Sequence, residues 1–207
     1  MLRVQGAAGF GLFLLLAGCG ALDVLDRASA PLEVFELRPP EIDGAAGASR
    51  PLDVIVELPV ASGSIATDRI MIRPDPLRAQ YLPDARWADP VPQMVQTLMV
   101  RSLGDSAALR YVGRSPLGVG GDYAVLTEII GFHAEAFAAE GAQVEIELLV
   151  RLVRESDAAV VSTRRIKAAA EAPSTDSPAL AAAFDRAVRT ALGDFVGWVL
   201  GAVRTSS

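Results

Sequence analysis

The chain has 207 residues, with 19 Lys and Arg against 25 Asp and Glu, which gives a formal net charge of −6. This acidic balance argues against nucleic acid as a partner and against charge-driven adhesion to anionic lipid, since both require basic patches. One cysteine and one histidine exclude a disulfide, a cysteine-based metal site and most zinc or catalytic-triad arrangements. We therefore predict no cofactor, no metal site and no enzyme activity.

The first residues have the organisation of a secretory signal. Arg3 precedes roughly ten apolar residues, too few to span a bilayer as a helix, which needs about 20. The stretch ends in Leu16-Ala17-Gly18-Cys19, which resembles the lipobox of bacterial lipoproteins. The alternative is an ordinary signal peptide with an incidental cysteine, but the only cysteine stands where a lipobox requires it. We predict a cleaved signal peptide at residues 1–18 and lipid attachment at Cys19.

Lipidation would fix the mature protein to a membrane surface. Each buried methylene contributes about 0.8 kcal/mol, and two or more acyl chains make attachment effectively permanent. Loss of Arg3 with the signal changes the side-chain charge from −6 to −7, so the acyl chains and not charge would supply the anchoring. Gly20 occupies the position where Asp is the usual inner-membrane retention signal in enteric bacteria. This favours an envelope lipoprotein of the outer membrane, facing the periplasm.

After the cysteine, residues 19–32 are small and polar enough to form a tether, and residues 33–207 are predicted to form one domain. A helix is expected from Asp89, which can cap it, through Pro90 in the first turn to a stop at Gly104. Short strands are predicted on either side of this helix, at 33–37, 52–58, 70–72, 80–82 and 109–112.

The second half of the domain is predicted to be a meander closed by a long helix. Residues 143–152 alternate most clearly between apolar and polar, and strands at 123–132 and 159–167 flank them. From Pro178 onward an apolar stripe has helical spacing and comprises Leu180, Phe184, Val188, Ala191, Phe195 and Trp198. The fold class is therefore α+β: a single two-layer domain with a mostly antiparallel sheet and two main helices packed on it.

The lone histidine is the first candidate functional residue. His133 lies at the expected end of a strand beside Glu135, but no motif supplies a nucleophile or further ligands. We interpret it as a strand-edge histidine paired with a carboxylate. Glu145 and Glu147 share the polar face of the next strand and could act as paired carboxylates only inside a cleft. An exposed or partner-binding face is the favoured interpretation.

Other candidates favour structural roles. The glycine-rich run Gly118–Gly121 lacks the Gly-Lys-Ser/Thr of a phosphate loop and is interpreted as a turn. Asp75, Asp84 and Asp89 lack calcium-loop spacing and are interpreted as solvated loop acids. Trp87 is expected to be a core aromatic at the helix entry.

Several short motifs follow one another in a characteristic order. The most specific is Tyr81-Leu82-Pro83, followed by Arg86-Trp87-Ala88-Asp89-Pro90-Val91-Pro92 opening a helix. The lipobox, a Phe-Glu-Leu strand, Asp68-Arg69-Ile70, Asp122-Tyr123 and Trp198 complete the order. Over nearly its whole length the chain resembles the ABC-type transport auxiliary lipoprotein family.

The resemblance implies a non-enzymatic accessory lipoprotein that docks on an ABC transporter with a substrate-binding subunit of the mammalian-cell-entry type. Such systems are thought to move lipids or other apolar molecules between the inner and outer membranes. Of the family's functional residues it carries over only Cys19; Tyr81 and Trp87 match the pattern but are expected to be structural.

Three alternatives stay open, beginning with an outer-membrane assembly or structural lipoprotein that supports lipopolysaccharide or cell-wall machinery. The others are a hydrolase using Glu135, Glu145 and Glu147, and direct lipid carriage in an apolar cavity. Exposed sheet edges also leave a homo-oligomer open.

Overall fold

A computed structural model describes residues 32–42, 49–118, 120–137 and 140–205. The predicted signal peptide, Cys19 and all of the tether but Leu32 lie outside the described residues. Glu33–Ser207 forms one compact unit, which is described below.

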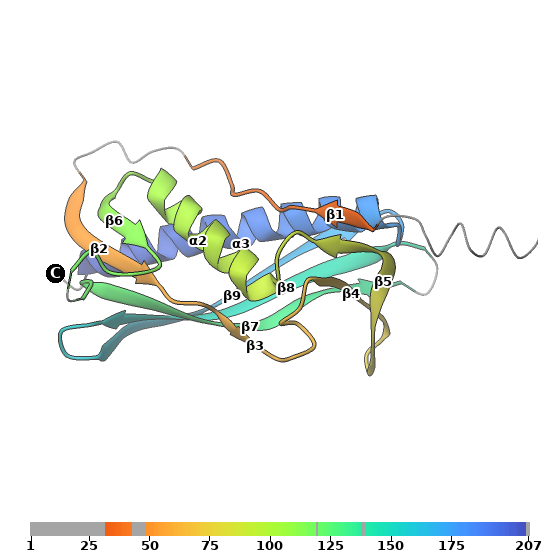
Figure 1. The fold of residues 1–207 in the computed structure, drawn as a ribbon, viewed down its shortest axis with the longest axis horizontal. Helices are drawn as coiled ribbons and strands as arrows, with labels where there is room; N and C mark the ends of the chain where they lie inside the picture. The colour runs from red at the N-terminus through yellow and green to blue at the C-terminus, as the bar shows by residue number, and fades with distance from the viewer. Residues whose placement is uncertain (1–31, 43–48, 119, 138–139, 206–207) are drawn as a thin grey trace, which may run out of the picture. The chain divides into compact units, whose positions relative to one another are not determined.

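Three long strands form the antiparallel backbone of the sheet: β7 (Tyr123–Ala136), β8 (Ala142–Arg154) and β9 (Ala159–Ala172) (Figure 1). β8 pairs with β7 on one side and with β9 on the other, as the predicted meander requires. β7 is longer than predicted, because its pairing with β8 continues to Ala136. The prediction that His133 ends a strand was therefore wrong, and this residue lies within β7.

The other edge of β7 pairs in parallel with three short strands in succession: β2 (Arg50–Val56), β3 (Val60–Ala61) and β4 (Arg69–Asp75). β4 continues antiparallel into β5 (Arg78–Trp87), and β5 pairs in parallel with β1 (Glu33–Phe35). β6 (Leu109–Gly113) pairs in parallel with β2. The described strands thus form one mixed sheet, in which the longest pairings are antiparallel.

Two helices, α2 (Val91–Asp105) and α3 (Ser177–Thr205), cover one face of the sheet (Figure 1). The alternating residues Val144, Ile146, Leu148, Val150 and Leu152 of β8 are buried beneath them, together with Phe184 and Phe195 of α3. Apolar periodicity of two in the strand and of three to four in the helix creates these complementary faces. The α+β fold class with two main helices is confirmed.

The start of α2 differs from the prediction in its capping. Pro90 is the N-cap residue, and no side-chain cap hydrogen bond forms. The backbone amide of Val91 instead donates to the carbonyl oxygen of Thr67 at 3.0 Å. A tertiary contact therefore satisfies a helix N-terminal amide that we predicted the side chain of Asp89 to cap. At the other end, Gly104 lies in the last turn and the helix continues to Asp105.

The face of β7–β9 opposite the helices is here called the open face. Strand alternation and register place on it the residues that do not point toward α2 and α3. They are Leu126, Glu128, His133 and Glu135 of β7, Gln143, Glu145, Glu147, Leu149 and Arg151 of β8, and Val160, Thr163, Arg165, Lys167, Ala169 and Glu171 of β9.

Candidate functional site

The open face combines exposed apolar side chains with charges of both signs. Leu126 is 40% exposed and Val160 is 56% exposed, which is high for residues of a regular sheet. Glu147 lies between two cations, with an ion pair to Arg165 and a 3.1 Å contact to the Nζ of Lys167. Burial alone would raise the pKa of Glu147, but hydrogen bonds from Arg165 and Lys167 outweigh it and hold that pKa below its ordinary value. An apolar area with fixed charges around it is typical of a protein-docking surface.

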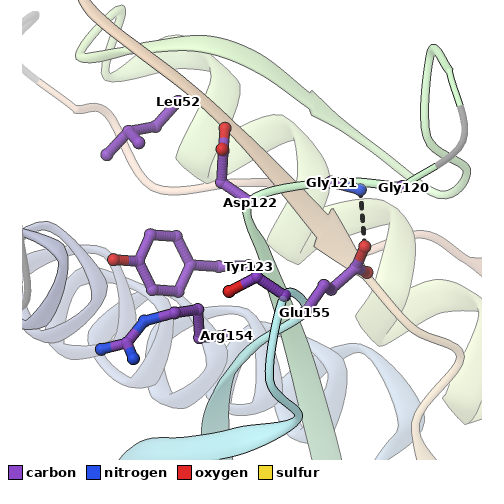
Figure 2. A pocket seen from close by; sticks show the side chains of 8 residues that line it. Leu52, Gly120, Gly121, Asp122, Tyr123, Arg154 and Glu155 are labelled. Atoms are coloured by element: carbon purple, nitrogen blue, oxygen red, sulfur yellow. Dashed lines mark hydrogen bonds between the residues drawn. The ribbon is translucent and has the colours of Figure 1, made fainter.

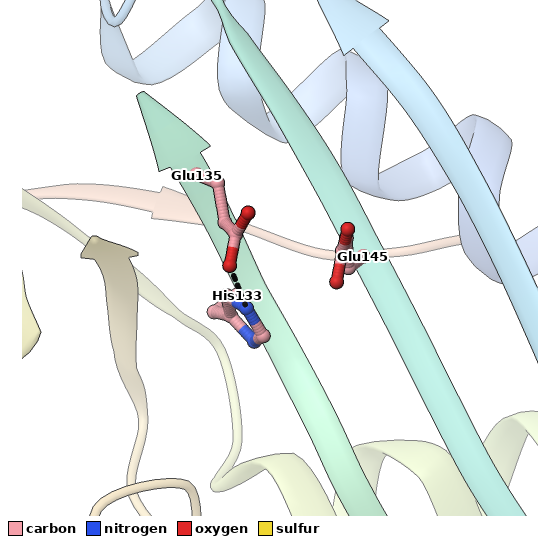
Figure 3. A group of neighbouring side chains, drawn as sticks. All are labelled: His133, Glu135 and Glu145. Carbon is pink, nitrogen blue, oxygen red and sulfur yellow. Dashed lines mark ion pairs between the residues drawn. The ribbon is translucent and has the colours of Figure 1, made fainter. Parts of the chain in front are cut away.

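Three polar side chains gather farther along the same face (Figure 3). His133 and Glu135 are two residues apart on β7, and Glu145 of β8 is the register partner of His133. Each of the three offers a donor atom, and these atoms lie within 4.8 Å of one another. The sequence analysis paired His133 with Glu135 and placed Glu145 separately, on the polar face of the next strand. It could not bring the three together, because the register between strands cannot be predicted from spacing along the chain.

A hollow of about 420 Å³ lies where β7 begins and β8 ends (Figure 2). Two carboxylates of its lining are already paired within the chain: Glu155 accepts a hydrogen bond from the amide of Gly121, and Asp122 accepts one from the amide of Asp53 at 2.7 Å. The glycine-rich run is thus held by a carboxylate and provides no phosphate-binding amide at Gly121.

Asp75, Asp84 and Asp89 are not brought together into a site, and the loop interpretation was wrong for Asp75, which ends β4, and for Asp84, which lies within β5. Asp75 pairs with Arg78 at 2.9 Å in the turn between β4 and β5. Asp84 accepts a hydrogen bond from the hydroxyl of Ser177 at 2.8 Å and so links β5 to the start of α3. The structure accordingly gives Asp75 and Asp84 local structural roles.

The aromatic residue before α2 is part of the core, as predicted. Trp87 is fully buried, and its ring meets Phe132 and Phe184 edge-on at centroid distances of 6.1 and 5.1 Å. Tyr81 is half-buried, and its hydroxyl donates to the carbonyl of Ser64 at 2.9 Å.

Sequence reasoning missed the ion pair between the exposed Arg38 and the buried Asp185. Asp185 points from α3 into the packed region and accepts hydrogen bonds from the amide of Arg38 at 3.0 Å and from its guanidinium at 2.8 Å. Burial would raise the pKa of Asp185, but its hydrogen bonds with Arg38 lower it below the ordinary value. The only signal in the sequence was an acidic residue next to Phe184 in an otherwise apolar stripe.

The space between helices and sheet is filled. The apolar cavity lined by residues such as Leu98, Phe132, Leu148 and Leu192 holds about 10 Å³. Binding cavities for ligand-sized molecules hold about 300–1,000 Å³. No helix in the described ranges is long and apolar enough to cross a membrane.

The chain matches a known protein family over most of its length. The family model for the ABC-type transport auxiliary lipoprotein component matches residues 35–194. The chain belongs to this family. The family consists of lipoproteins that are auxiliary components of ABC-type transport, which supports an association with the cell envelope.

Known proteins resemble this chain in sequence, in fold or in both. An uncharacterised protein of Bradyrhizobium diazoefficiens is 29% identical over 196 residues; the match covers 91% of this chain, which spans about half, 50%, of that relative. The crystal structure of protein XCC0632 from Xanthomonas campestris is 28% identical with a TM-score of 0.76, and the match covers 83% of this chain and 97% of that one. The hypothetical protein CT253 of Chlamydia trachomatis, at 12% identity and a TM-score of 0.52, shares the fold over 75% of this chain and 99% of its own.

Proposed function

We propose that this auxiliary lipoprotein is anchored through Cys19 in the outer membrane and faces the periplasm. It acts there without catalysis, by docking on a mammalian-cell-entry-type subunit of an ABC transporter that moves lipids or other apolar molecules between the membranes. The observation that carries this proposal is the family match over residues 35–194, since it concerns most of the described domain and not a short motif.

The open face is the surface that we assign to docking. Leu126 and Val160 supply exposed apolar area, while Arg151, Arg165 and Lys167 supply charges that can select a partner. The opposite face of the sheet is covered by α2 and α3 and is therefore not available. The filled core supports action by contact and argues against carriage of a lipid within the domain.

Lys167 gives a sharp test of this assignment, because it is the only lysine of the chain. Its side chain is 66% exposed and lies on the open face. An amine-reactive cross-linker applied to intact envelopes can attach to this protein only at Lys167 or at the N-terminal amine. We expect a cross-linked product with a mammalian-cell-entry-type subunit, identified by mass spectrometry.

The matched control is Lys167→Arg, which keeps the charge and the contact with Glu147 but removes the reactive amine. We expect this variant to lose the cross-link while it still co-purifies with the partner. A cross-link of equal yield in Lys167→Arg would contradict the assignment of the open face. Products made only with lipopolysaccharide or cell-wall machinery would contradict the transporter role and favour the assembly lipoprotein.

A further inference from the structure

The buried histidine of the open face has no hydrogen-bond partner for its ring nitrogens. His133 is only 5% exposed, and neither Nδ1 nor Nε2 makes a hydrogen bond within the described part of the chain. Glu135 comes nearest, with its Oε1 at 3.5 Å from Nε2, which is beyond the usual range for N–H···O hydrogen bonds. A buried polar group without a partner is costly, so this imidazole is a position where a ligand would supply missing stabilisation.

The carboxylate of Glu145, next to this histidine, differs from that of Glu147 in its contacts with cations. Arg165 and Lys167 neutralise Glu147. Glu145 lies two residues before Glu147 on the same face of β8, opposite His133 of β7. Its carboxylate accepts no hydrogen bond from any residue in the described ranges. In the described part of the chain, β7 and β8 thus place a carboxylate that accepts no hydrogen bond beside an imidazole that makes none.

The charges around the imidazole suit a cation. A ring nitrogen of the imidazole can offer its lone pair to a metal ion. Arg73 of β4 is the register partner of Glu135 and brings one opposing positive charge. With two carboxylates and one guanidinium, the group keeps a negative local charge that attracts a divalent cation.

We propose that His133, Glu135 and Glu145 bind a divalent transition-metal ion of the Zn²⁺ class on the open face. Zn²⁺ binds imidazole nitrogen and carboxylate oxygen at about 2.0–2.2 Å, and three protein ligands leave a fourth position for water. Donor atoms that lie within 4.8 Å of one another reach this geometry through small rotations of the glutamate side chains, and that of Glu135 is 45% exposed. The imidazole favours such an ion over Mg²⁺ or Ca²⁺, which prefer oxygen ligands only.

This site does not depend on the proposed transporter role. It would join β7 to β8 and stiffen the open face whatever partner binds there. The positive charge of Arg73, the register neighbour of Glu135 on β4, would weaken the site without filling a ligand position.

The test is Zn²⁺ titration by calorimetry of the full chain, purified in detergent with a tag that contains no histidine. Alkylation beforehand blocks any free thiol at Cys19. We expect the chain to bind one Zn²⁺, and its dissociation constant for Mg²⁺ to be at least tenfold larger than that for Zn²⁺. Glu135→Gln and Glu145→Gln should each weaken Zn²⁺ binding about tenfold or more, because each removes one charged ligand.

Glu128→Gln is the matched control, since this glutamate lies on the same strand and face but outside the cluster. It should leave the dissociation constant for Zn²⁺ within about twofold of the original. His133→Gln should abolish binding, with its folding checked by circular dichroism; if that variant fails to fold, the two glutamate variants decide. The proposal is overturned if the unaltered chain binds no Zn²⁺ at millimolar concentration, or if Glu135→Gln and Glu145→Gln bind as tightly as Glu128→Gln.

Discussion

Asp185 shows how a single residue can carry a charge inside an apolar helix face. It is only 9% exposed, and both its oxygens are engaged by Arg38, which follows β1. The arginine thereby connects the first described segment of the domain to its last helix across 147 positions of sequence. Because one partner is buried, loss of the other leaves an uncompensated charge, which costs more than loss of an exposed pair.

Asp185→Asn is expected to lower the free energy of unfolding at pH 7 by about 1–3 kcal/mol, since Arg38 loses its charged acceptor. The pKa of Asp185 is lower in the folded chain than its ordinary value of 3.8. Its contribution is therefore present above pH 3.8 and is lost as the pH falls through the folded pKa. Urea unfolding followed by circular dichroism should show the difference between variant and original shrink below pH 3.8.

Asp75→Asn serves as the control, because the Asp75–Arg78 pair lies in an exposed turn. We expect a change of no more than about 0.5 kcal/mol at pH 7. The charge-dependent role of Asp185 would be contradicted if Asp185→Asn lowered the free energy of unfolding by no more than this, or if its effect were the same at low pH.

At the scale of elements, the sequence predicted the helices and the meander well. Residues 143–152 alternate at every position but Leu149, and β8 extends that pattern by only a few residues because both of its edges are paired. The apolar stripe from Leu180 to Trp198 likewise predicted α3, which begins at Ser177. Local periodicity identifies such elements because one face of each is buried and the other is not.

The parallel pairings could not be predicted in the same way. β2, β3 and β4 align with β7 through contacts about 60–70 residues apart, and no local pattern records such a partner. β3 has only two residues and carries no periodicity. The same reason explains the candidate site: His133 and Glu135 were visible as neighbours, but the position of Glu145 opposite them depends on register.

The turn between β8 and β9 contains a strained residue. Ala158 has a φ of +54°, a left-handed conformation that costs roughly 1–2 kcal/mol for a residue with a Cβ. Ala158→Gly should therefore raise the free energy of unfolding by about 0.5–1 kcal/mol after the entropic cost of glycine is subtracted. Urea unfolding of Ala158→Gly beside Ala159→Gly provides the check, because Ala159 is in β9 and its replacement should destabilise. A loss of stability in both variants would contradict the strain.

At the scale of the whole molecule, the proposed function gives the lipidated N-terminus and the domain different roles. The lipid at Cys19 would hold the protein at a membrane, where two or more acyl chains make attachment effectively permanent. The domain beyond it has a filled core and one sheet face free of helices, so its contribution would be contact with a partner. The apolar cargo would then pass through other subunits and not through this chain.

The most direct test of this account is affinity purification of the tagged protein from detergent-solubilised envelopes, followed by mass spectrometry. A Cys19→Ser variant, which cannot receive the lipid, is purified in parallel. We predict that a mammalian-cell-entry-type subunit and its ATPase co-purify with the unaltered protein, and that their recovery falls in the variant. A preparation without either subunit, or one containing lipopolysaccharide or cell-wall machinery in their place, would contradict the central claim.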